Sequence, residues 1–161
     1  MKNIYTIGVY NSTKETFFEK LIKYKIDTFC DIRRRRGVRG AKYSFVNSLR
    51  LQATLKEMNI NYYHFLELSP SNEIREKQKK HDIQNKINKR NRTILGEVFS
   101  DLYIREHLTE KNLLDVEQRL ADSPASNVAF FCVEENHKAC HRSLLASSLV
   151  KRNPNIKAMN I

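Results

Sequence analysis

The densest group of reactive side chains lies in an eleven-residue stretch near the C-terminus, from Cys132 to Arg142. This stretch contains two thiols, two imidazoles, two carboxylates and a guanidinium. The hydrophobic residues 128–131 before it are typical of a buried strand, and residues 143–150 after it are typical of an amphipathic helix. We therefore expect these groups on a strand-to-helix turn, which is where ligands bind in α/β proteins.

Cys140 is the candidate nucleophile of this stretch. A thiol at a helix N-terminus beside His141 and Arg142 has the surroundings that favour a reactive thiolate. The alternative is a small buried residue that caps or packs the helix. Cys132 ends the apolar strand, and there we expect a core thiol, because burial keeps a thiol protonated and inert.

Two carboxylates are candidates for proton transfer. Asp31 ends an expected strand at 27–32, and Glu134 follows the strand at 128–131. A carboxylate surrounded by arginines is held ionised and makes a poor acid, so we favour orienting roles toward Arg33 or Arg142. General acid or base catalysis is the alternative. The candidate catalytic residues are Asp31, Glu134, Cys140 and His141.

Metal and cofactor signals are weak in this sequence. Cys132, His137, Cys140 and His141 have zinc-compatible donors, but paired Cys-x2-Cys or His-x3-His spacings are missing. A phosphatase loop is disfavoured, because the loop after Cys132 contains no glycine. Gly8 is isolated after the first expected strand, so a dinucleotide fingerprint is also absent. We expect neither a metal nor a cofactor.

The formal net charge of +11 comes from two segments. Residues 33–42 contain six basic residues and no acidic ones, and residues 71–92 contain eight basic residues against three acidic ones. Such a patch attracts polyanions and favours phosphate contacts. Nucleic acid or a phosphorylated small molecule is the expected partner, and a merely solubilising surface is the alternative. Tyr43 and Phe45 could stack on bases, although core packing is the commoner use of such residues.

The order of the expected elements predicts the fold. Strands at 3–10, 27–32, 61–65, 128–131 and 156–161 alternate with amphipathic helices, including 94–108 and 110–121. This alternation is typical of a three-layer, Rossmann-like α/β protein with a mostly parallel sheet and helices on both faces. We expect a single domain over residues 1–161, with residues 71–92 as a basic insertion or mobile helical segment.

Polar residues follow several of these strands. Parallel strands bring their carboxyl ends to one edge of a sheet, where the N-terminus of the last long helix could also hold an anion. We expect a shared site at that edge. The candidate substrate- or phosphate-binding residues are Gly8, Asn11, Arg33, Arg34, Arg36, Glu67 and Arg142.

Composition and the N-terminal sequence indicate the cellular compartment that we expect for the protein. No run approaches the roughly 20 apolar residues that span a bilayer, and the N-terminus passes into a strand without a signal-peptide core. Three cysteines are an odd number in such a chain. We expect a cytoplasmic protein with reduced thiols and no membrane partner.

Several of these motifs resemble a known family, the prokaryotic domain of unknown function 488. The most specific is Cys-x-Glu followed closely by Cys-His-Arg after a hydrophobic strand. The resemblance implies a compact α/β domain with these residues clustered, and it indicates a site more than a reaction. Tyr10 departs from the family, which usually has a histidine there. The matching segments are Tyr5–Ser12, Phe29–Arg33, the Phe45 region, Tyr63–Leu68, Phe131–Glu134 and Cys140–Ser143.

Three functions are consistent with these residues. The first is an enzyme or enzyme-like binder that acts on a nucleotide or nucleic acid through the Cys/Glu/Cys-His-Arg cluster. The second is a nucleic-acid-binding module without catalysis, in which the motif residues only brace the fold. The third is a thiol redox or metal-dependent protein.

Overall fold

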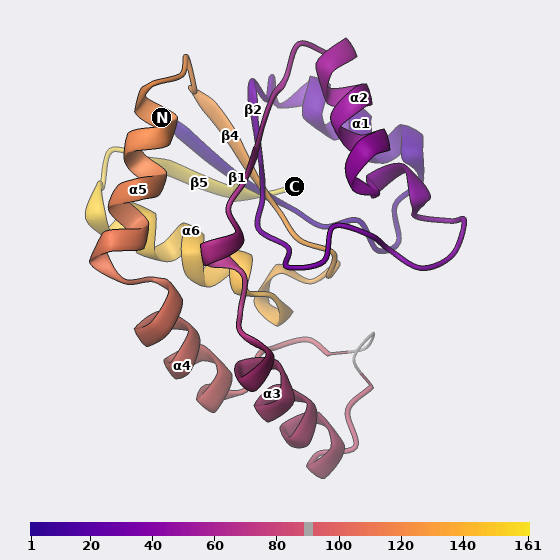
Figure 1. Cartoon of the computed structure of the whole chain (residues 1–161), viewed down its shortest axis with the longest axis vertical. Helices are drawn as coiled ribbons and strands as arrows, with labels where there is room; N and C mark the ends of the chain where they lie inside the picture. The colour runs from indigo at the N-terminus through magenta and orange to yellow at the C-terminus, as the bar shows by residue number, and fades with distance from the viewer. Residues whose placement is uncertain (89–91) are drawn as a thin grey trace.

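A five-stranded parallel sheet forms the middle layer of the structure, a computed structural model that describes residues 1–88 and 92–161 (Figure 1). The strand order is β3-β2-β4-β1-β5, and every neighbouring pair is parallel. This confirms the predicted α/β class. The strands are β1 (Asn3–Ile7), β2 (Thr28–Asp31), β3 (Asn61–His64), β4 (Asn127–Phe131) and β5 (Lys157–Asn160).

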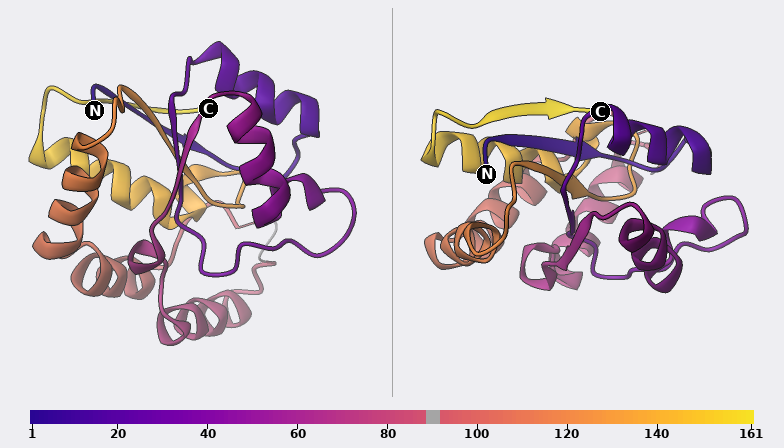
Figure 2. Two further views of the ribbon diagram at one scale, coloured as in Figure 1. Left: turned by 45° about the horizontal axis from the view of Figure 1, so that its top comes forward. Right: turned by 90° about the horizontal axis from the view of Figure 1, so that it is seen from above.

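Helices cover both faces of the sheet (Figure 2). Phe29, Ala129 and Phe131 face the side of α1 (Lys14–Lys23) and α2 (Ser48–Glu57). Alternate residues of the same strands, such as Cys30 and Phe130, face a second core. This period-two alternation divides the apolar residues of the central strands between two cores. The second core is built from α3 (Asn72–Gln84), α4 (Glu97–His107), α5 (Glu110–Ala121) and α6 (His141–Arg152).

Hydroxyl side chains cap the N-termini of three of these helices. The side chains of Thr13, Ser71 and Thr109 each accept a hydrogen bond from the backbone N–H three residues later. Such caps satisfy amides that have no partner within the helix. Asn47 precedes α2 but instead accepts from the Val38 N–H at 2.6 Å, so its side chain anchors the arginine-rich loop after β2.

The chain leaves the sheet earlier after β1 than the sequence predicts. The sequence predicts a strand as far as Tyr10, but β1 ends at Ile7. The amides of Val9 and Tyr10 both donate to the carbonyl of Val133, in the loop after β4. Two donors on one carbonyl break the regular ladder, and the loops after β1 and β4 are thereby held together.

Strand order explains where a site can form. β4 lies between β1 and β2, and the connections after β1 and β2 lead to α1 and α2. The connection after β4 leads to α6, on the opposite face. Strand ends at which neighbouring connections diverge to opposite faces are the usual ligand sites of open α/β sheets.

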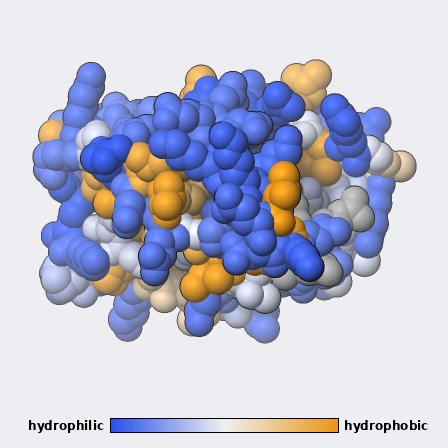
Figure 3. Space-filling model, turned by 90° about the horizontal axis from the view of Figure 1, so that it is seen from below, coloured by the Kyte–Doolittle hydropathy of each residue, from blue (hydrophilic) through white to orange (hydrophobic). Residues whose placement is uncertain are grey.

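The basic segment packs through a polar face. α3 ends at Gln84, and residues 89–91 of the segment lie outside the described residues. Gln78 donates to Asp82 at 2.7 Å, and Asp82 accepts from Arg92 at 2.9 Å. The face of the molecule seen from below in Figure 1, on the side of α3 and α4, is mostly hydrophilic, with small hydrophobic patches (Figure 3). Among the described residues, no helix is both long and apolar enough to cross a membrane.

Candidate functional site

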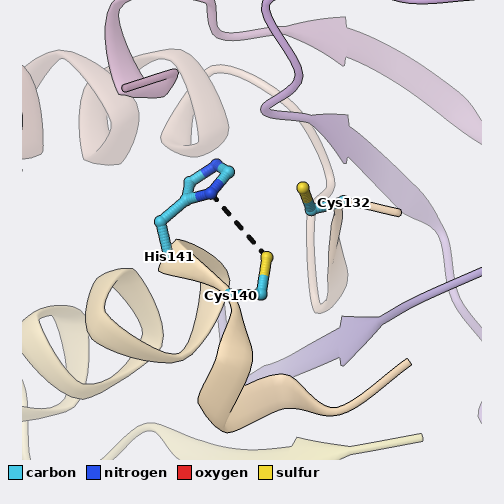
Figure 4. A group of neighbouring side chains, drawn as sticks. All are labelled: Cys132, Cys140 and His141. Carbon is cyan, nitrogen blue, oxygen red and sulfur yellow. Dashed lines mark hydrogen bonds between the residues drawn. The ribbon is translucent and has the colours of Figure 1, made fainter. Parts of the chain in front are cut away.

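Cys132, Cys140 and His141 form a buried cluster at the carboxyl edge of the sheet (Figure 4). Cys132 directly follows β4, Cys140 precedes α6, and His141 is the first residue of α6. The two sulfur atoms and one ring nitrogen all lie within 4.8 Å of one another. The Sγ of Cys140 is 3.7 Å from the Nδ1 of His141. Cys132 is 8% exposed, Cys140 2% and His141 5%.

A backbone carbonyl sets the orientation of the His141 ring. Its Nε2 lies 3.3 Å from the carbonyl oxygen of Ile32, directly after β2. A carbonyl only accepts, so this bond requires the proton on Nε2 and leaves the lone pair of Nδ1 toward the sulfurs. Burial lowers the pKa of His141, so the neutral ring is favoured. The edge-to-face contact with Tyr103 packs the ring from the α4 side.

The two thiols have opposite tendencies to ionise. Burial would raise the pKa of Cys140, but the hydrogen bond from Cys132 and the charge of Arg142 lower it to about 7. The same hydrogen bond, together with burial, raises the pKa of Cys132 well above its ordinary value. Cys140 is therefore the thiol of the pair that ionises more readily, and Cys132 is the one that keeps its proton and donates. This agrees with the expectation that burial keeps the Cys132 thiol protonated, and it adds a hydrogen bond from that thiol to Cys140.

Arg142 holds the loop after β4 in place. Arg142 is 2% exposed, and its guanidinium donates to the carbonyls of Glu134 at 2.6 Å and Glu135 at 2.8 Å. Gly8 packs against the same loop, and a Cβ there would lie 2.0 Å from the Glu134 carbonyl oxygen. The sequence predicts substrate or phosphate binding for Gly8 and Arg142. The contacts described for both residues support the loop after β4, which carries Cys132.

Asp31 and Arg33 form a buried ion pair on the α1/α2 side of the sheet, whereas Cys132 and Cys140 belong to the core on the other side. Nε and Nη2 of Arg33 donate to the two carboxylate oxygens at 2.8 and 2.7 Å, and Nη2 also reaches the Val46 carbonyl. The guanidinium lies 4.5 Å from the Phe131 ring centroid. Tyr62 donates to Asp31 as well, and burial and the Asp31 charge raise the pKa of Tyr62 to about 12. This geometry favours the orienting role over the general base.

Other candidate residues have partners elsewhere on the edge. Glu67 pairs with Arg119 of α5 at 3.1 Å, and the side chain of Asn11 donates to Glu135. Glu134 lies 3.7 Å from Arg92, which also donates to the Ala139 carbonyl. Arg92 therefore ties the basic segment to the cluster loop.

Three arginines come near one another between the loop after β2 and α3. Arg34 and Arg35 belong to the loop after β2, and Arg34 donates to the Pro70 carbonyl just before α3. Burial lowers the pKa of Arg75 in α3, the nearby Cys132 sulfur opposes this, and the charges of Arg34 and Arg35 add to it. We call Arg34, Arg35 and Arg75 the arginine cluster. Arg36 turns instead toward Tyr62.

Arg75, Asp82 and Arg92 are residues of this site that sequence reasoning does not find. They lie in a lysine-rich segment whose spacing resembles a solvated helix, and Arg92 is 47 residues away from its partner Ala139. In the sequence, the one signal for these contacts is Asp82, an acidic residue within a basic run, and the structure buries it. These contacts depend on how α3 packs.

Fold and site together define a three-layer α/β protein with a thiol-imidazole cluster at the carboxyl edge of its sheet. The family model for a domain of unknown function, DUF488, matches residues 13–149, and the chain belongs to this family. The match includes Cys132, Cys140 and His141 as well as the arginine cluster, and it begins after Gly8 and Asn11. Neither the curated proteins nor the solved structures yielded a match.

Proposed function

We propose that this protein acts on a nucleotide or nucleic acid, whose phosphate is bound by the arginine cluster next to Cys132, Cys140 and His141. The observation that supports this most directly is the hydrogen bond from Arg34 to the Pro70 carbonyl at 3.2 Å, which joins the loop after β2 to the start of α3, where the charges of Cys132, Arg34 and Arg35 act on Arg75. A positive surface and a group of reactive side chains thus meet at one sheet edge.

Anchoring of the arginines favours phosphate binding over a merely solubilising charge. Arg34 and Arg75 are half-buried, and the loop that bears Arg34 is fixed by the bond from Ser48 N–H to the Arg36 carbonyl at 2.9 Å. Arginines held in place lose little side-chain entropy when they bind a phosphate, and their planar groups match its oxygens. Arg35 is exposed and adds a contact from solvent.

The low exposure of the cluster limits how a ligand can reach it. Cys140 and His141 are more buried than Cys132, whose charge acts on Arg75 of α3. A phosphate bound by the arginines would therefore meet the cluster from the Cys132 side. The buried contacts of Asp31, Arg33 and Arg142 support the alternative, a binding module without catalysis in which these residues brace the fold.

Charge reversal of the loop arginines tests this proposal. For the Arg34→Glu/Arg35→Glu variant we expect binding of short single-stranded DNA and RNA to weaken roughly tenfold or more. The slope of log affinity against log salt should fall by roughly one for each phosphate that the variant no longer binds. Fluorescence anisotropy of labelled oligonucleotides across a salt series measures both quantities, with a labelled mononucleotide as the small-ligand arm.

Lys111→Glu/Lys151→Glu is the matched control, because it reverses two exposed charges, one on α5 and one near the end of α6, away from the arginine cluster. It should shift affinity only slightly. Equal losses of affinity in the two variants would mean that net charge alone drives binding. If wild-type protein binds neither the oligonucleotides nor the mononucleotide at low salt, the proposed function is wrong.

A further inference from the structure

We propose that Cys132, Cys140 and His141 bind a zinc ion. This site goes beyond the proposed phosphate binding and does not depend on it. Two thiolates and an imidazole are donors that zinc prefers, and the three come from a single strand-to-helix turn.

The distances between the donor atoms suit a tetrahedral ion. Zinc–sulfur and zinc–nitrogen bonds of about 2.3 and 2.0 Å place neighbouring ligand atoms about 3.5 to 3.8 Å apart. The Cys140 Sγ and His141 Nδ1 are 3.7 Å apart, already within this range. All three donors lie within 4.8 Å of one another, so side-chain movements of about 1 Å would complete the arrangement.

His141 is oriented as metal-binding histidines are. Such residues donate their other ring N–H to a carboxylate or backbone carbonyl, which fixes the tautomer and turns the free lone pair toward the metal. The Ile32 carbonyl accepts from Nε2 here, while Nδ1 faces the sulfurs. Because Ile32 N–H is itself bound to the Phe131 carbonyl, this support is part of the sheet.

Charge balance also favours a divalent ion. Without a metal, Cys132 keeps its proton; loss of that proton would bury two thiolates together, which is costly unless two positive charges neutralise them. Binding would release the remaining thiol protons to solvent. The neutral unit would then be compatible with Arg75 and Arg142, which otherwise surround the sulfurs with positive charge.

The fourth position of a tetrahedral site would be open to an external ligand. Within residues 1–88 and 92–161, the group of possible ligands consists of these three side chains. Sites with three protein ligands are the usual arrangement of catalytic zinc, in which water or substrate occupies the fourth position. Cys132 is the most exposed of the three, and its charge acts on Arg75 of α3. Water or an anionic oxygen would suit that side.

The test uses full-length protein kept reduced, stripped with a chelator and then titrated with Zn²⁺ or Co²⁺. We expect one metal ion per chain by elemental mass spectrometry. The Co²⁺ form should have a near-ultraviolet sulfur-to-cobalt charge-transfer band and the intense visible bands of four-coordinate cobalt. Wild-type protein that binds neither metal, or binds Co²⁺ without the sulfur band, would overturn the proposal.

Single-site variants assign the ligands. Cys132→Ser and Cys140→Ser should each weaken zinc binding by at least the roughly 100-fold that loss of a supporting group can cost. Cys30→Ala is the control, because Cys30 is a fully buried thiol in β2 outside the group of possible ligands. Circular dichroism checks folding. If the serine variants fold and keep wild-type affinity, zinc is bound elsewhere. The same conclusion holds if Cys30→Ala loses the metal equally. If the serine variants unfold, the cobalt spectrum of the wild-type protein decides.

Discussion

Asp31→Asn is expected to lower the free energy of unfolding by about 3–5 kcal/mol, because it leaves the charge of Arg33 buried without a counter-charge. Asp31 is fully buried, and Arg33 is 3% exposed. Water cannot replace the lost carboxylate there. The guanidinium would keep the Val46 carbonyl as a partner but lose its bidentate pairing.

Urea unfolding followed by circular dichroism measures this effect. Asp115→Asn is the matched control, because Asp115 pairs with Arg119 at 3.4 Å on the surface, where its side chain is 49% exposed. Surface pairs contribute about 0–1 kcal/mol, so the control should change stability little. The double variant Asp31→Asn/Arg33→Met should recover part of the loss by removing the unpaired charge. Equal effects of Asp31→Asn and Asp115→Asn would contradict the structural role of Asp31.

The sheet could be predicted because its signals are local. Apolar runs such as 128–131, and caps such as Thr13 and Thr109, define strands and helices without reference to the rest of the chain. Strand order could not be predicted in this way. The position of β4 between β1 and β2 depends on which faces the helices cover, and the early end of β1 depends on the Val133 carbonyl of a distant loop.

The candidate site, like the fold, has one part that local sequence predicts and another that depends on distant segments. Cys132, Cys140 and His141 lie on one turn, so their spacing alone predicts that they are neighbours. Whether the sulfurs and the ring nitrogen face one another depends on the Ile32 carbonyl, which belongs to the end of β2. The expectation of no metal rests on missing paired spacings, and such spacings describe only sites whose ligands come from short hairpins or single helices.

Arg33 and Arg142 illustrate why residue type alone does not separate a binding arginine from a structural one. The sequence predicts phosphate binding for both, and in the structure both donate to groups of the protein itself. Arg34 and Arg35 belong to the same run as Arg33, but Arg34 is half-buried and Arg35 exposed, whereas Arg33 and Arg142 are buried. Burial, which the sequence alone does not give for these residues, is the discriminating feature.

Zinc and phosphate would support each other at this edge. Without a metal, a thiolate at Cys140 partly offsets the positive charge of the nearby arginines. With zinc, both sulfurs are neutralised by the ion, and the full charge of the arginine cluster is available for an anion. Oligonucleotide affinity should therefore not decrease when the stripped protein is loaded with zinc, and anisotropy titrations of the two forms would measure this.

Gly8→Ala is expected to destabilise the protein by about 3 kcal/mol, because its Cβ would overlap the Glu134 carbonyl oxygen. A separation of 2.0 Å to a backbone atom cannot be relieved by rotating a side chain, so the loop after β4 must move. That loop is also held by Arg142, and its displacement would stretch the two hydrogen bonds to the Glu134 and Glu135 carbonyls.

Gly37→Ala is the control for this change, since a Cβ at Gly37 would have its nearest neighbour 3.9 Å away, in ordinary van der Waals contact. Urea unfolding compares the stabilities, and zinc titration of the variant that remains folded reports on the cluster. Because the displaced loop carries Cys132 and leads to Cys140, we expect metal affinity to fall together with stability. A Gly8→Ala protein as stable as Gly37→Ala would mean that the two loops are not packed together as the structure describes.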